Sequence, residues 1–185
     1  MPAWNLGLRG LERKQQMLLT IPLPAHEAAI NQNKIIITTM SYTIRRIVDT
    51  HPERVNELKQ KCYAINGCLL TVLNDLGPFL NEYIYQDALQ ILLDERQILY
   101  QREYYFSIDY RGKKIAHKHY VDFLINDEII VECKAAEKLC IEHRQQLWNY
   151  MRLTGKQIGI LFNFGPLKGQ SEHYYLDTNG TMYMF

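Results

Sequence analysis

The sequence predicts an α/β protein whose mixed central sheet is flanked by helices. Three observations lead to this fold class. Two segments with helical spacing of apolar residues come first, and three segments rich in Tyr, Phe, Ile and Val follow them. A further helical segment then separates those strands from a last apolar strand. A strand that follows its neighbours only after an intervening helix indicates a crossover connection, and therefore a parallel pair within the sheet.

Two amphipathic helices are expected before any strand. Residues 53–76 repeat apolar side chains at helical spacing, and Gly77-Pro78 is a typical helix stop. Residues 82–97 continue with a second apolar stripe and with polar side chains elsewhere. The apolar positions that predict the first helix are Val55, Leu58, Cys62, Ile65, Leu69 and Val72, and those that predict the second are Tyr85, Ala88, Leu89 and Leu92.

The strands are expected in the second half of the chain. Residues 99–110 and 113–125 read as two antiparallel strands around a turn at Arg111-Gly112. A break at residues 126–128 precedes a third strand that ends at Lys134. Helical spacing returns over residues 139–153, with Gly155 after it, and the remaining expected strands are residues 157–165 and a weaker one within 171–185.

Length and composition indicate one ordinary globular domain. The chain has 185 residues, 47% of them hydrophobic and 22% charged, and it contains no apolar run of the roughly 18 residues that a membrane helix needs. We expect a single domain over residues 40–185. Residues 1–39 precede the regular patterning, and we interpret them as a loosely ordered extension or as the product of an upstream start.

The charge and the cysteines restrict the partners and the compartment. A net charge of +1 gives no overall field that favours nucleic acid, so such binding would depend on a local patch. The four cysteines match no zinc spacing and are too few for a disulfide scaffold. Reduced thiols in a cytoplasmic protein that does not span a membrane are the simplest interpretation.

Charged residues interrupt the two strands on either side of the break at 126–128. The segment YVDFLINDEIIVECK carries Asp122 in its first half and Glu132 and Lys134 in its second, and unpaired buried charges are costly. Side chains alternate faces along a strand, which puts Glu132 with Lys134 and leaves Cys133 in the core. A turn of three residues would place Asp122 opposite Glu132, whereas a turn of two would not.

Two opposed carboxylates with a neighbouring ammonium group can perform metal-assisted hydrolysis. Asp122 and Glu132 can share one Mg²⁺ or Mn²⁺, and Lys134 can stabilise phosphoryl charge or orient a water. Gln146 lies on an otherwise apolar helical stripe, and Glu82 follows a helix break. The alternative interpretation is an exposed cross-strand ion pair without a metal, since D-x9-E-x-K is a weak pattern on spacing alone.

Four segments, in order, resemble the GxxExxY proteins, a bacterial branch of the PD-(D/E)XK nuclease superfamily. They are LGPFLNEYIYQDAL, YVDFLINDEIIVECKAAEKL, HRQQLWNYMRLTG and QIGILFNFG. The resemblance implies a restriction-endonuclease-like αβββαβ core. It also implies a metal site built from an acid of the early helical region, the D…ExK hairpin and a Gln of the following helix. Those positions are Glu82, Asp122, Glu132, Lys134 and Gln146, with Asp122, Glu132 and Glu82 as the expected metal ligands.

This sequence departs from the family pattern at two positions. Phe79 stands where the family usually has its second glycine, although Gly77, Glu82 and Tyr85 remain. Leu73 stands where many members carry a histidine in the first helix, so no role is expected there. Tyr85 and His143 are further candidates for lining the pocket.

The densest basic stretch lies around the first hairpin. Arg111, Lys113, Lys114 and Lys118 are candidates for phosphate contacts, and tyrosines close by in sequence are available for stacking on bases. The competing interpretation is a solvated turn. His117 and His119 have the spacing of metal ligands, but alternate surface histidines are more common.

The sequence therefore predicts a metal-dependent nuclease, with DNA as the expected substrate and Mg²⁺ or Mn²⁺ as cofactor. The alternative is a module that keeps the fold but only binds nucleic acid or protein, since a small, nearly neutral nuclease needs a surface or a partner protein to hold its substrate. A covalent mechanism is not expected, because no nucleophile motif is present.

Overall fold

A computed structural model describes residues 44–185. The boundary expected between residues 39 and 40 lies outside this part of the chain. The elements of the described part are β1 (Arg45–Arg46), the 3-10 helix η1 (Ile47–Asp49), α1 (Pro52–Leu76), α2 (Glu82–Glu95), β2 (Tyr100–Phe106), β3 (Asp109–Tyr110), β4 (Lys113–Lys114), β5 (His119–Ile125), β6 (Ile129–Lys134), α3 (Ile141–Thr154), β7 (Ile158–Asn163), β8 (Gln170–Leu176) and β9 (Met182–Met184).

Seven strands form one mixed sheet in the order β1-β9-β8-β7-β6-β5-β2. β6 and β7 pair in parallel, with α3 as the connection between them, so the predicted crossover is confirmed. β2, β5 and β6 pair antiparallel in sequence order. The mixed sheet flanked by helices agrees with the predicted restriction-endonuclease-like α/β fold class.

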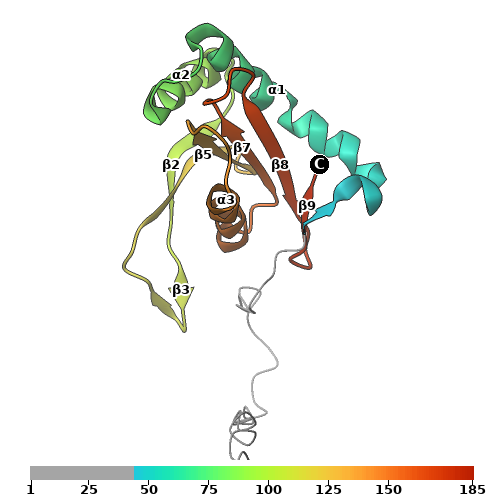
Figure 1. Ribbon diagram of the computed structural model, residues 1–185. Helices are drawn as coiled ribbons and strands as arrows, with labels where there is room; N and C mark the ends of the chain where they lie inside the picture. The colour runs from blue at the N-terminus through green and yellow to red at the C-terminus, as the bar shows by residue number, and fades with distance from the viewer. Residues whose placement is uncertain (1–43) are drawn as a thin grey trace, which may run out of the picture. The chain divides into compact units, whose positions relative to one another are not determined.

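The helices cover the two faces of the sheet (Figure 1). On one face, buried residues of α1 and α2 pack against alternate residues of the central strands, among them Phe123 and Val131. On the other face α3 packs through Leu147, Trp148 and Met151 against Leu124 and its neighbours. The central strands β6 and β7 are buried along their whole lengths, which explains why their sequences are nearly continuous apolar runs.

Element boundaries follow the expected stop signals. Pro52 occupies the first turn of α1, where its missing N–H costs nothing, and Gly77 follows the helix end with a positive φ of 71°. Gly155 ends α3 in the left-handed conformation. The weak strand expected within residues 171–185 is in fact a hairpin, β8 and β9, because the turn Asp177–Gly180 reverses the chain.

The first predicted hairpin is longer than its paired core. The chain leaves the sheet after Phe106, forms the small β3–β4 ribbon and returns at His119 (Figure 1). Arg111 and Gly112 are the turn residues, as predicted, and both have positive φ, as in the type I′ turns that connect hairpins. We call residues 107–118 the basic arm.

Within residues 44–185 no helix is long and apolar enough to span a membrane. All four cysteines are free thiols, and Cys133 is completely buried, as its strand position predicts.

Candidate active site

The turn between β5 and β6 has the length that the site requires. Ile125 pairs with Ile129, so residues 126–128 form a connection of three residues, and the register runs through Phe123–Val131. One further step along this register sets Asp122 opposite Glu132. The expectation of an odd turn is therefore confirmed.

The pairing stops at Asp122, however, and the strand is irregular there. Val121 and Leu124 both pack on the α3 side, although strict alternation would put them on opposite sides. The neighbouring β2–β5 register also skips this point, because Arg102 pairs with Phe123 and Tyr104 with Val121. The assumption of regular alternation through Asp122 was therefore wrong. Asp122 and Glu132 instead meet where the β5–β6 pairing stops, through contacts of each carboxylate with the backbone of the other strand.

Short contacts hold the two acids in this gap. One Asp122 carboxylate oxygen, Oδ2, accepts a hydrogen bond of 2.8 Å from the backbone N–H of Cys133. The backbone N–H of Asp122 lies 3.5 Å from Glu132 Oε1, and Lys134 Nζ donates to Glu132 Oε2 at 3.3 Å. Glu132 and Lys134 are buried at 0% and 9% exposure, so this ion pair is not the exposed surface pair of the alternative interpretation.

The electrostatics of the cluster favour a bound cation. Burial, and then the nearby Asp122 charge, raise the pKa of Glu132 to about 8 against the opposing effect of Lys134. Burial also raises the pKa values of Asp122 and Glu82, and in Glu82 the Asp122 charge adds to the effect. The site thus gathers three carboxyl groups around a single ammonium group.

Lys134 remains a cation in this setting. Burial opposes its charged form, but the carboxylates of Glu132, Glu82 and Asp122 outweigh burial and hold its pKa above the ordinary value. A charged, nearly buried lysine beside three acids is available as a hydrogen-bond donor to an anionic substrate.

Glu82 reaches the cluster from the first turn of α2. Its carboxylate accepts a hydrogen bond from the backbone N–H of Ala135, directly after Lys134, and interacts with the Lys134 charge. Tyr85 is completely buried beneath it. The Tyr85 hydroxyl donates to Gly77 O at 2.7 Å and accepts from Leu80 N at 3.0 Å, so this side chain fixes the loop that leads to Glu82 and does not line a pocket.

Phe79 occupies that same loop in a conformation that favours glycine. Its φ is 73° and its side chain is 82% exposed. The structure therefore gives a physical reason for a glycine at this position of the motif, since a residue without Cβ adopts positive φ at no steric cost.

The site contains two residues that sequence reasoning missed. Gln86 donates to the Asp122 carboxylate, and the Arg102 charge also lowers the Asp122 pKa. Gln86 lies one helical turn after Glu82, so its spacing could have revealed it. Side chains of α2 fix the direction of Arg102, because its guanidinium contacts Gln90 at 2.7 Å and Asp87 at 2.6 Å. No local pattern in the β2 sequence predicts that contact.

The segment that carries Ala135 is fixed from β7. The buried Asn163 accepts from Ala136 N at 2.9 Å and donates to Ala136 O at 2.9 Å. A Cβ on Gly165 would lie 1.9 Å from Ala136 O, so only glycine fits there. These contacts set the position of the backbone N–H that binds Glu82.

Gly165→Ala is expected to lower the free energy of unfolding by at least about 1–3 kcal/mol, because a rigid backbone contact must move. Gly67→Ala is the matched control. Position 67 lies inside α1, and a methyl added there meets only the flexible end of the Arg96 side chain. Alanine also stabilises a helix interior by about 0.5–1 kcal/mol relative to glycine. Urea unfolding of both variants measures the difference, and equal stabilities would contradict the tight fit at Gly165.

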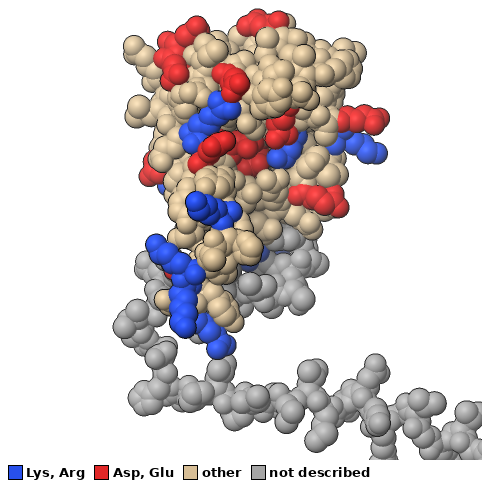
Figure 2. Space-filling view, turned by 90° about the vertical axis from the view of Figure 1, so that its left-hand side faces the viewer, with Lys and Arg blue, Asp and Glu red and all other residues tan. Residues whose placement is uncertain are grey.

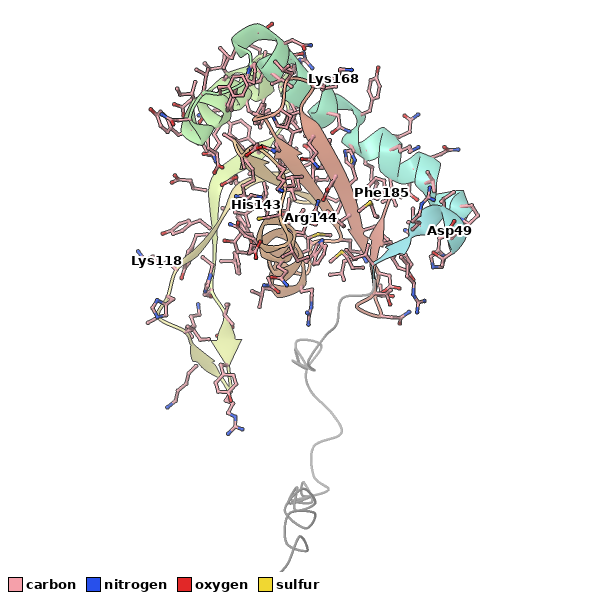
Figure 3. All side chains as sticks on the ribbon, viewed as in Figure 1. Asp49, Lys118, His143, Arg144, Lys168 and Phe185 are labelled. Carbon is pink, nitrogen blue, oxygen red and sulfur yellow. The ribbon has the colours of Figure 1, made fainter. Side chains whose placement is uncertain are left out.

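The two α3 candidates make hydrogen bonds within their own helix and its N-cap. The Gln146 amide donates to the Tyr150 hydroxyl at 3.2 Å, one turn further along the helix. His143 accepts at Nδ1 from Cys140 N at 3.4 Å, within the N-terminal turn of α3 (Figure 3). Burial, then the Lys134 charge, lower the pKa of His143, which favours its neutral form.

The four cations predicted to contact phosphate lie together on the basic arm. Arg111, Lys113, Lys114 and Lys118 are all exposed. Figure 2 shows these blue side chains gathered on the projecting arm, and acidic side chains are more frequent over the body above it. Within the described residues, no three His, Cys, Asp or Glu side chains form a group that could hold a metal, and this includes the pair His117 and His119.

Comparisons with known proteins show the family of this chain. Residues 59–174 match the PD-(D/E)XK nuclease superfamily. Among solved structures, the chain is similar to one described as "Crystal structure of SSO0001", with 23% identity and a TM-score of 0.43 over 53% of this chain. It spans about half of that chain, 52%. No curated protein matches. The family match covers more than half of the sequence, and the chain belongs to the PD-(D/E)XK nuclease superfamily.

Proposed function

We propose that this protein is a metal-dependent nuclease that hydrolyses phosphodiester bonds of nucleic acid, with DNA as its substrate. The observation that carries the proposal is the meeting of Glu82, Asp122 and Glu132 with Lys134 where β5 and β6 separate. A buried ion pair that served only stability would not need two further acids beside it.

The donor set fits Mg²⁺ or Mn²⁺. Magnesium in proteins is held by one or two carboxylates and keeps several waters. Asp122 and Glu132 supply two hard oxygen ligands, and a divalent cation would offset the burial and the Asp122 charge that together raise the Glu132 pKa. Because no group of three such ligands forms within residues 44–185, we assign the ion to these two acids and give Glu82 a positioning role.

A bound ion of this kind supplies Lewis-acid polarisation of the phosphodiester and a more acidic water. The remaining steps belong to the side chains. Lys134 donates a hydrogen bond to the phosphoryl oxygen that gains charge in the transition state. Glu82, fixed by Ala135 N–H, keeps the Lys134 ammonium charged. Gln86 and Cys133 N–H orient the Asp122 carboxylate.

We assign the chain to the GxxExxY branch because of the conformation of the loop before Glu82. Gly77 and Phe79 both have positive φ, and Tyr85 ties the loop to the helix through its hydroxyl. The phenylalanine is the departure, since the branch has a glycine at that position. A cytoplasmic, bacterial setting is part of the same proposal.

The basic arm is proposed to contact phosphates. Residues 107–118 carry four cations and one acid, a net charge of +3 in a chain whose net charge is +1. This separation of charge supplies the local patch that the overall composition lacks. A partner protein that delivers substrate remains part of the proposal, and a module that only binds is the competing function.

Asp122→Asn is expected to abolish cleavage, because it removes one ligand charge while keeping the hydrogen bond to Cys133 N–H. The assay compares single- and double-stranded DNA and RNA with Mg²⁺, Mn²⁺ or chelator. Asp49→Asn, in η1 and away from the site, is the control and should cleave like the wild type (Figure 3). Full activity of Asp122→Asn would contradict the assignment, and an inactive wild type that binds DNA would favour the binding module.

A further inference from the structure

Two tyrosines form an exposed pair at the base of the basic arm. Tyr105 of β2 and Tyr120 of β5 are register partners. Their ring centroids are 5.7 Å apart with planes tilted by 50°, and the residues are 50% and 44% exposed. Large aromatic side chains in contact with each other and still half open to solvent present a π-surface without burying it.

The pair lies on the same side of the sheet as Asp122. Tyr104 and Phe106 pack on the α3 side, so Tyr105 between them faces the other way. Val121 also packs on the α3 side, which turns Tyr120 toward the side of α2. The bond from Gln86 of α2 to Asp122 puts the Asp122 carboxylate on that side as well. Tyr120 is two residues from Asp122, a distance of about 7 Å along a strand.

The other two tyrosines of this region, Tyr104 and Tyr110, have different surroundings. Tyr104 packs against the core of the α3 face, and Tyr110, on the arm itself, is 61% exposed and has the Arg111 guanidinium 5.6 Å from its ring centroid. Of these four tyrosines, only Tyr105 and Tyr120 are ring partners of each other, and both remain about half exposed. On one side of this pair lies the carboxylate cluster, and on the other lie the cations of the arm.

We infer that Tyr105 and Tyr120 form a stacking platform for an unpaired base, and that the substrate of this protein is single-stranded or carries a single-stranded segment. This inference rests on the proposed function and deepens it. In a duplex both faces of an internal base are covered by its neighbours, so a tyrosine pair adds affinity only where a base is unstacked. Cations alone would suffice to bind a duplex through its phosphates. In this arrangement the tyrosine pair stacks on one base, and the cations of the basic arm contact the phosphates of the nucleic-acid backbone. The phosphodiester next to the stacked base then lies at Asp122.

The experiment measures binding separately from cleavage. Fluorescence anisotropy in chelator compares a single strand of about 12 nucleotides with a blunt duplex of the same length, a size within the usual range for single-strand sites. The variants are Tyr105→Ala and Tyr120→Ala, each with its Phe counterpart, which keeps the ring. Tyr63→Ala, which removes an 80% exposed tyrosine from α1, is the matched control.

Each alanine variant is expected to weaken single-strand binding by roughly 5- to 150-fold, the range for one base–aromatic stack, and to leave duplex binding within about twofold. The Phe variants and Tyr63→Ala should bind like the wild type. Unchanged single-strand binding, or equal losses on both substrates, would overturn the inference. Cleavage by the wild type in Mn²⁺ is scored independently. If the wild type cleaves but the alanine variants bind single strands normally, only the stacking platform is rejected. If the wild type does not cleave but the alanine variants lose single-strand binding, only the nuclease activity is rejected.

Discussion

Glu132→Gln is expected to abolish cleavage and, at the same time, to make the fold more stable at neutral and alkaline pH. The carboxylate is completely buried, and burial followed by the Asp122 charge raises its pKa to about 8. The wild-type protein therefore bears the cost of a disfavoured charge that a neutral amide of the same shape does not have. A site that lowers stability in this way is typical of residues retained for their chemistry.

The ionisation of Glu132 determines how the free energy of unfolding changes with pH. In the unfolded chain Glu132 ionises near its ordinary pKa of 4.5, whereas in the folded protein it holds its proton to about pH 8. The folded state binds more protons between these values. The stabilising contribution of protonated Glu132 is thus complete below pH 4.5 and is lost as the pH rises through about 8. The limiting slope is roughly 1.4 kcal/mol per pH unit for one group.

Urea unfolding at a series of pH values measures this effect. The free energy of unfolding of the wild type should fall over the window from pH 4.5 to about 8, and that of Glu132→Gln should fall less steeply. Glu137→Gln, an exposed change nearby, should follow the wild type. Mn²⁺ should raise the stability of the wild type, by about 2.7 kcal/mol at a hundred times its Kd, and should not raise that of Glu132→Gln. Parallel pH profiles for all three proteins would show that Glu132 is not the titrating group.

Lys134→Met is expected to lower kcat by about 10²- to 10³-fold while leaving Mn²⁺ binding in place. The ammonium group is nearly buried and pairs with Glu132 at 3.3 Å, but it is not a metal ligand. Its loss removes a positioned donor to the transition state, and donors of that kind contribute this magnitude. Methionine fills a similar volume without charge, so the backbone at the end of β6 should stay in place.

Single-turnover cleavage gives the rate of the chemical step, and calorimetric titration with Mn²⁺ gives the affinity. Lys168→Met removes a lysine from the β7–β8 connection and should change neither quantity (Figure 3). If Lys134→Met cleaved at the wild-type rate, Lys134 would have only a structural role. If it lost Mn²⁺ binding together with activity, the lysine would act by setting the charge of the acids.

Local patterning in the sequence determined the elements and much of the site. The helical spacing before Gly77 and before Gly155, and the apolar runs of β6 and β7, depend on neighbours within one turn or one strand. The crossover follows from their order. The candidates Asp122, Glu132 and Lys134 were visible because charges within an apolar strand need a reason, and Glu82 because it follows a helix break within the motif that resembles a known family.

Only the tertiary structure decided how these residues meet. The irregularity at Asp122 lies where the pairing with β2 and the pairing with β6 are both interrupted, so a rule of alternation within one strand could not reveal it. Gln86 and Arg102 join the site across the α2–sheet interface, and the open pair of Tyr105 and Tyr120 depends on the register of two strands. Spacing along the chain specifies the face of an element. The contacts between faces are set by how whole elements pack, and this is a property of the folded chain.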